Sequence, residues 1–264
     1  MKREQFYRWI SASHEIFEVF EDRGESYIYC IRWVDEYFEK GRFTITEKIK
    51  NNLLDDVNNL YIKDKSIENF LKSEYKMFID NLPRNNDKLA FAFAPYLMFW
   101  NVRRFEEYFK KDKNFNLIEY FDKLNEDIRE FDTIFKILRK RHILDDDINE
   151  KSVKILLNDL NQTLKKLSPL SQNEYIMAIK TLHIIAPYYF PLLDNPIIGA
   201  LKKVENIGKD EDGYIKYIEF IRNFLINYYF ECKKLENKFN LSILKLLDEA
   251  FYVRYSIDWI RYLK

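Results

Sequence analysis

Apolar residues recur at three- and four-residue intervals along almost the whole chain. Near the start, Phe6, Ile10, Phe17 and Phe20 follow this spacing, which is the period of one face of an α-helix. The same spacing predicts further helices over residues 27–38, 45–60, 66–80, 87–111, 117–138, 153–167 and 214–229. The sequence has no stretch of the clean two-residue alternation that indicates a half-buried strand. The pattern predicts an all-α fold, a compact orthogonal bundle of roughly ten to twelve helices.

The segment from Leu89 to Val102 is the longest stretch without a charged residue. Its fourteen residues fall short of the about 20 that a membrane-spanning helix needs. We therefore predict a buried helix, kinked where Pro95 removes a backbone hydrogen bond. The opening residues, MKREQFYRWI, lack the apolar run of a secretory signal. These features predict a cytoplasmic protein without membrane association.

A heptad pattern follows, in which apolar residues alternate four and three positions apart. Its members are Leu117, Phe121, Leu124, Ile128, Phe131, Phe135 and Leu138. A regular seam of this kind forms between two packed helices. An intramolecular helix pair explains the seam more simply than a dimeric coiled coil, because a dimer would need a matching set of side chains on its partner.

The composition is that of a globular protein, with 47% hydrophobic and 33% charged residues in a chain of 264. This length allows one all-α domain over residues 1–264 or two packed helical lobes, about 1–143 and 144–264. The chain contains only five glycines, which argues against folds that wrap phosphates in glycine-rich loops. Its 43 basic and 43 acidic residues balance, so there is no global field that would draw the protein to nucleic acid.

Metal and cofactor sites have no recognisable motif in the sequence. Cys30 and Cys232 both fall inside helical patterns, far apart along the chain, and are expected to be buried free thiols. No cysteine–histidine spacing of a zinc site and no phosphate-binding loop is present. We therefore predict neither a metal nor a cofactor.

The stretch KTLHIIAPYYFPLLDNPI, residues 180–197, differs from the rest of the chain. Ser171 and Glu174 have the spacing of a capping box that would start the helix carrying Lys180, and Pro187 would end that helix. His183 lies three residues after Lys180 and therefore shares its face. The seven residues 187–193 span at most about 23–25 Å, which allows Asp194, a candidate helix cap, to return close to Lys180.

This pattern of lysine, histidine, prolines and aspartate resembles a motif of uncharacterised helical proteins related to the helix-hairpin-helix DNA glycosylases. In those enzymes a lysine amine attacks the sugar carbon that carries the damaged base, and an aspartate stabilises the cationic sugar. The resemblance implies that Lys180 and Asp194 are catalytic and that DNA is the partner. A flipped base needs rings to stack on, and we predict that Tyr188, Tyr189 and Phe190 bind substrate together with His183.

Other interpretations remain open for the same residues. Lys180 is also compatible with a lysine whose charge reaches solvent, His183 and the three rings with core packing, and Asp194 with helix capping alone. The neutral surface and the heptad seam fit a helical interaction module that binds a protein partner and catalyses nothing. Arg8 and His14 have an R-x5-H spacing that resembles helical ribonucleases of the nucleotide-binding-prokaryote type.

Overall fold

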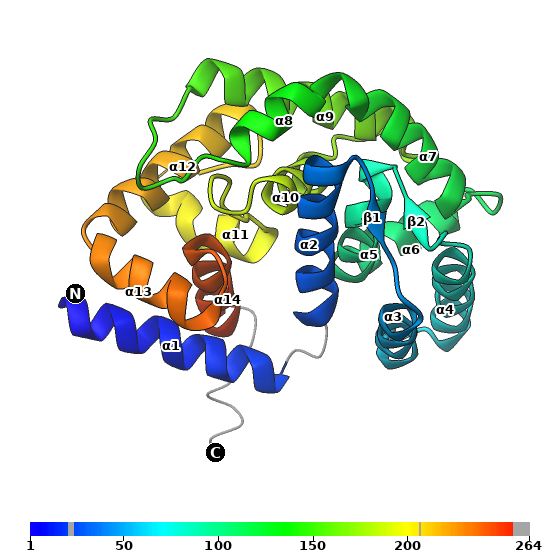
Figure 1. The fold of residues 1–264 in the computed structure, drawn as a ribbon, viewed down its shortest axis with the longest axis horizontal. Coiled ribbons are helices and arrows are strands. Elements are labelled where there is room, and N and C mark those ends of the chain that lie inside the picture. The colour runs from blue at the N-terminus through cyan, green and yellow to red at the C-terminus, as the bar shows by residue number, and fades with distance from the viewer. Residues whose placement is uncertain (21–23, 206, 256–264) are drawn as a thin grey trace. The chain divides into compact units, whose positions relative to one another are not determined.

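The computed structural model describes residues 1–20, 24–205 and 207–255, and almost all of its regular structure is helical (Figure 1). The all-α prediction is confirmed. The described residues form fourteen α-helices, one short 3-10 helix (η1) and two strands of two residues each. The number of helices rises above the expected ten to twelve because two of the predicted long helices are interrupted.

The first interruption lies at Asn101, between α5 (Leu89–Trp100) and α6 (Val102–Lys111). The Asn101 side-chain amide donates to the carbonyl of Leu97 (3.0 Å), and the backbone carbonyl of Asn101 accepts from the backbone N–H of Arg104 (2.8 Å). Asn101 thereby ends one helix and begins the next. Pro95 lies inside α5, so the break predicted for this segment comes six residues later along the chain.

The second interruption divides the heptad seam. The short helix η1 (Arg129–Phe131) separates α7 (Leu117–Ile128) from α8 (Asp132–Leu138). Asn116 caps α7, since its side-chain oxygen accepts from the N–H of Glu119 (3.0 Å). The heptad residues of α7 are buried, and this helix packs against α4 (Lys65–Asp80) and α5. The heptad face of α7 therefore packs against other helices of the same chain, as the intramolecular interpretation predicted.

The chain divides into two compact units, and neither is continuous in sequence. Unit 1 comprises Met1–Glu21, Ile137–Asp159 and Ala178–Lys264, and unit 2 comprises Asp22–Lys136 and Leu160–Met177. The two lobes that the sequence analysis allowed, about 1–143 and 144–264, are each one continuous piece of the chain. The boundary instead falls within α8, α9 (Glu150–Leu167) and α10 (Tyr175–Ile185).

Unit 2 is built on an aromatic core. Besides α4 to α7, its complete elements are α2 (Gly24–Lys40), β1 (Phe43–Thr44), α3 (Glu47–Asn59), β2 (Asn85–Asn86) and η1. Helix α5 packs against α2 and α7, and α3 packs against α4. Phe78 and Phe91 stack with ring centroids 5.6 Å apart, and Phe121 contacts both. Buried rings of this size contribute a large part of a core's stability.

The predicted capping box of α10 is not formed. Ser171 has a positive φ of 53°, and the Glu174 carboxylate pairs with Arg104 on α6 (Nη2–Oε1 2.6 Å). The N–H of Glu174 donates to the side-chain oxygen of Asn161 (2.6 Å). Glu174 is buried, and a buried carboxylate requires a cation and hydrogen bonds, so this ion pair takes the place of the capping interaction.

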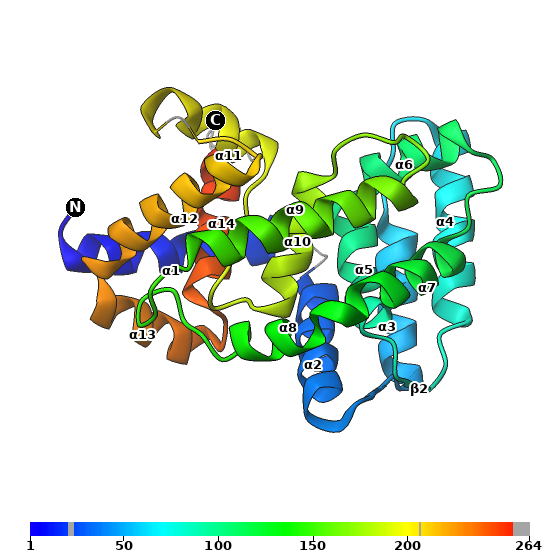
Figure 2. The same cartoon turned by 90° about the horizontal axis from the view of Figure 1, so that it is seen from above.

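Unit 1 contains the helix at the start of the described chain and those at its end. Its complete helices are α1 (Arg3–Phe20), α11 (Asn195–Glu205), α12 (Glu211–Ile226), α13 (Tyr229–Phe239) and α14 (Ile243–Tyr255). Helix α1 runs beside α13 and α14, and α14 also packs against α11 (Figure 2). Among the described residues, none of the helices combines the length and the apolar character that crossing a bilayer requires.

Candidate functional site

The turn that follows α10 is a buried segment outside any helix, held in place by hydrogen-bond donors from other elements of unit 1. Buried backbone groups require partners, and four successive or nearly successive carbonyls find them. The Tyr188 carbonyl accepts from the backbone N–H of Ile143 (2.9 Å), and the Phe190 carbonyl accepts from His183 Nδ1 (2.7 Å). The Pro191 carbonyl accepts from the Tyr214 hydroxyl (2.9 Å), and the Leu192 carbonyl accepts from the Tyr217 hydroxyl (2.8 Å). This bonding gives the segment a defined path and fixes where Asp194 emerges.

Asp194 caps helix α11. Its Oδ1 accepts from the N–H of Ile197 (3.1 Å), and its carbonyl accepts from the N–H of Ile198 (2.9 Å). Asn195 and Pro196 are the first two helical residues, so the cap is Asp194, as the sequence analysis allowed. The Asp194 carboxylate remains partly exposed.

Lys180 and Asp194 both act on a third residue, Asp248 of α14. Burial is the largest cause of a raised Asp248 pKa, which lies at about 6. The cations of Lys245 and Lys180 lower this pKa, while the carboxylates of Asp194 and Glu249 raise it. Asp248 is 14% exposed in its side chain. The predicted amine and carboxylate of the 180–197 stretch therefore share one electrostatic neighbour.

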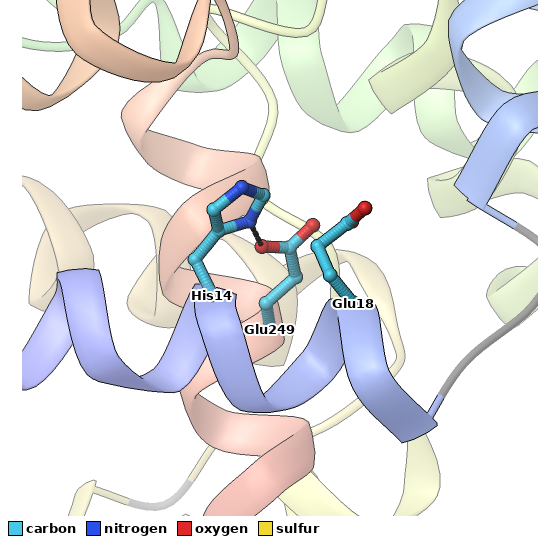
Figure 3. Close-up of side chains that lie close together, drawn as sticks. All are labelled: His14, Glu18 and Glu249. Atoms are coloured by element: carbon cyan, nitrogen blue, oxygen red, sulfur yellow. Dashed lines mark hydrogen bonds and ion pairs between the residues drawn. The ribbon is translucent and has the colours of Figure 1, made fainter.

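Asp248 belongs to a chain of buried charged groups that extends to helix α1. Lys245 Nζ lies 3.5 Å from Asp248 Oδ2 and 3.3 Å from Glu249 Oε1, and it also lies over the ring of Phe17. The other oxygen of Glu249 is 2.7 Å from His14 Nδ1 (Figure 3). Charges this deeply buried are rare unless they are paired, and buried ionisable groups that contact one another are candidates for a functional site.

The sequence analysis did not identify Asp248, Glu249 or Lys245. They lie on the last described helix, more than fifty residues beyond Asp194, and no spacing rule connects them to it. One signal was present in the sequence, since Asp248 and Glu249 are adjacent charges inside the otherwise apolar run LLDEAF. Adjacent carboxylates on an apolar helix cannot both face solvent if the helix is buried on most sides.

Three of the four predicted substrate-binding residues are core side chains. His183, Tyr189 and Phe190 are 0%, 1% and 0% exposed. Burial lowers the His183 pKa to about 3, so the ring is neutral and its Nδ1–H donates to the Phe190 carbonyl. Rings packed on all sides offer no face to a base in this conformation. Tyr188 keeps partial exposure and lies against the ring of His142, with centroids 5.6 Å apart.

Arg8 and His14 have separate partners in the described structure. Arg8 is 77% exposed and pairs with Glu4 on its own helix, while His14 pairs with Glu249 of α14. No hydrogen bond or ion pair among the described residues joins the two, which leaves the R-x5-H spacing without a shared site.

The arrangement in unit 1 thus places an amine, two aspartates and a buried lysine–glutamate–histidine series around α14. Comparisons with protein-family models, with curated proteins and with solved structures find no match to this chain.

Proposed function

We propose that the protein acts on nucleic acid through the amine of Lys180, in the manner of the DNA glycosylases that the 180–197 stretch resembles. One observation supports this proposal above the others: Lys180 and Asp194 both act electrostatically on Asp248. An amine and two carboxyl groups in one neighbourhood are the groups that amine-based sugar chemistry requires.

In the proposed reaction, the neutral Lys180 amine attacks C1′ of the sugar. The bond from C1′ to the base nitrogen breaks, and the base leaves with the electron pair and takes up a proton. The new C–N bond becomes an imine when the bond from C1′ to the ring oxygen opens and that oxygen is protonated. We assign to Asp248 the role of taking the proton that the Lys180 ammonium must first lose, and to Asp194 that of stabilising the positive charge that develops on the sugar.

The experiment is reductive trapping on a DNA duplex with a single abasic site. Sodium cyanoborohydride reduces an imine to a stable amine, so the wild-type chain should give one covalent adduct that gel electrophoresis resolves. Lys180→Arg retains the positive charge but forms no imine under these conditions, and we expect it to abolish the adduct. Lys216→Gln, which removes an exposed lysine of α12 in the same unit, should leave the adduct unchanged.

Asp194→Ser separates the catalytic role from the capping role. Serine caps helices about as well as aspartate, so α11 should be retained while the negative charge is lost. We expect the trapping rate to fall by about a hundredfold, the low end of what a group that stabilises developing charge contributes.

Two results would contradict the proposal. An adduct that persists in Lys180→Arg would assign the amine chemistry to another lysine. The absence of any adduct on abasic, uracil-containing and 8-oxoguanine DNA would exclude lysine chemistry and leave the alternative of a helical module that binds a protein partner.

A further inference from the structure

Three metal-ligating side chains from two helices converge beside the charged series of unit 1. His14 and Glu18 are four residues apart on α1 and so lie on one face of it, and Glu249 reaches them from α14 (Figure 3). One potential ligand atom from each residue lies within 4.8 Å of the other two. Such convergence across α1 and α14 depends on the packing of these helices and not on any local motif.

We propose that His14, Glu18 and Glu249 bind a divalent transition-metal ion, and that Zn²⁺ fits the donor set best. An imidazole nitrogen with two carboxylate oxygens suits zinc, whereas sites for Mg²⁺ or Ca²⁺ are built from oxygen ligands alone. Three protein ligands leave a fourth position of a tetrahedral ion open to water or substrate. This proposal does not depend on the amine chemistry of Lys180.

The His14–Glu249 pair needs only a small adjustment to accept the ion, and the exposed Glu18 side chain would swing in from its present distance of up to 4.8 Å. His14 Nδ1 and Glu249 Oε2 are 2.7 Å apart in their hydrogen bond. Ligand atoms around tetrahedral zinc are about 3.3 Å apart, because each lies about 2.0–2.2 Å from the metal. The two groups must therefore separate by about half an ångström. When the imidazole carries its proton on Nε2, Nδ1 presents its lone pair to the ion.

The surroundings hold two ligands in place and leave the third available. Glu249 is 1% exposed and its second oxygen is held by Lys245 (3.3 Å), while the His14 ring packs on Phe239 with centroids 4.3 Å apart. Such outer contacts orient metal ligands. Glu18 is exposed and makes no hydrogen bond or ion pair within the described part of the chain, so it opens a path for the ion from solvent.

The charges around the site favour a cation despite the nearby lysine. Two carboxylates contribute two negative charges, and Lys245 offsets one of them. The remaining negative charge attracts a divalent ion. Lys245 Nζ pairs with Glu249 Oε1 (3.3 Å), whereas Oε2 is the oxygen that faces His14 and that would bind the metal.

Isothermal titration of the full-length, chelator-treated chain with ZnCl₂ tests the proposal. We expect one Zn²⁺ per chain and no comparable binding of MgCl₂. Glu18→Gln should weaken zinc binding by at least about tenfold, since it removes one of three ligands. The variant should fold normally because Glu18 is exposed and unbonded. Glu15→Gln, which removes an equal charge from an exposed position on the same helix, should bind zinc as the wild type does.

A thermal melt gives a second readout that does not depend on any enzymatic activity. Saturating zinc stabilises a folded state that binds it, so zinc should raise the Tm of the wild type and of Glu15→Gln more than that of Glu18→Gln. The proposal is overturned if the wild type binds no stoichiometric zinc. Equal zinc affinity in Glu18→Gln and the wild type, or equal weakening by Glu15→Gln and Glu18→Gln, would also overturn it.

Discussion

The interiors of the two units are built from different chemistry. Unit 2 buries aromatic rings, with Tyr75, Phe78, Phe105 and Phe121 all at most 1% exposed. Unit 2 also buries carboxylates, such as Glu174 in its ion pair with Arg104. Unit 1 has an apolar core as well, but its buried charged or titratable groups are more numerous around one helix, α14, and several of them are joined in a series. Those groups are His14, His183, Lys245, Asp248 and Glu249.

The buried rings of unit 2 stabilise the fold, whereas the buried charged groups of unit 1 are retained at a cost to stability. Burying an aromatic ring is favourable in itself, whereas removing a charge from water is costly even when the charge is paired. A buried charged series is therefore weak evidence for stability and stronger evidence for a function. If this interpretation is correct, substitutions in the two units should have opposite effects on the free energy of unfolding.

The largest effect on stability should come from the aromatic core of unit 2. Phe121→Ala removes a fully buried ring that contacts Phe78 and Phe91, and we expect the free energy of unfolding to fall by about 3–5 kcal/mol. Urea denaturation measures this change. Tyr61→Ala removes a ring that is 78% exposed and is the matched control. Equal effects of the two substitutions would show that this core does not carry the stability of unit 2.

Asp248→Asn should stabilise unit 1 while it impairs trapping. The folded-state pKa of Asp248 is raised to about 6 from 3.8, so the unfolded chain loses this proton first as pH rises. The free energy of unfolding therefore falls between about pH 4 and 6, and above that range the carboxylate costs on the order of 3 kcal/mol. Asparagine removes this cost at pH 7.5. Denaturation of the variant should show a higher free energy of unfolding than the wild type.

The surface pair of Asp212 with Lys154 supplies the control for this charge change. Asp212 is 79% exposed, so Asp212→Asn should change stability only slightly, as is usual for exposed ion pairs. A clear loss of stability in Asp248→Asn would mean that the Asp248 carboxylate holds α14 in place, and the contrast between the units would then fail.

A smaller, pH-dependent effect should arise at His183. Its folded-state pKa of about 3 lies below the ordinary value of 6.5, mainly because of burial, so the unfolded chain binds the proton first as pH falls. Stability from this group is complete above about pH 6.5, and about 1.4 kcal/mol should be lost between pH 7.5 and 5.5. His183→Asn keeps an N–H donor for the Phe190 carbonyl and cannot titrate. Denaturation at both pH values should therefore show a smaller change in the free energy of unfolding for the variant than for the wild type. An equal change in the two proteins would assign the pH dependence to other groups.

Parts of the candidate site could be predicted from local sequence. Asp194 was a candidate cap because aspartate before a proline-containing helix start satisfies free N–H groups, and it does cap α11. The capping box at Ser171 and Glu174 followed the same kind of reasoning, yet Glu174 pairs with Arg104 seventy residues away. The rule holds at one position and fails at the other because a long-range ion pair outweighs a local hydrogen bond when the carboxylate is buried.

The sequence by itself determined that this protein is helical, because the three-to-four spacing of apolar residues leaves each segment one face to bury. It also located Lys180 and Asp194 on either side of one tight return. Only the tertiary structure decided which groups surround them. His14 and Glu249 are 235 residues apart and meet at 2.7 Å because α1 packs against α14, and contacts of that separation follow from the packing of whole helices rather than from any local pattern.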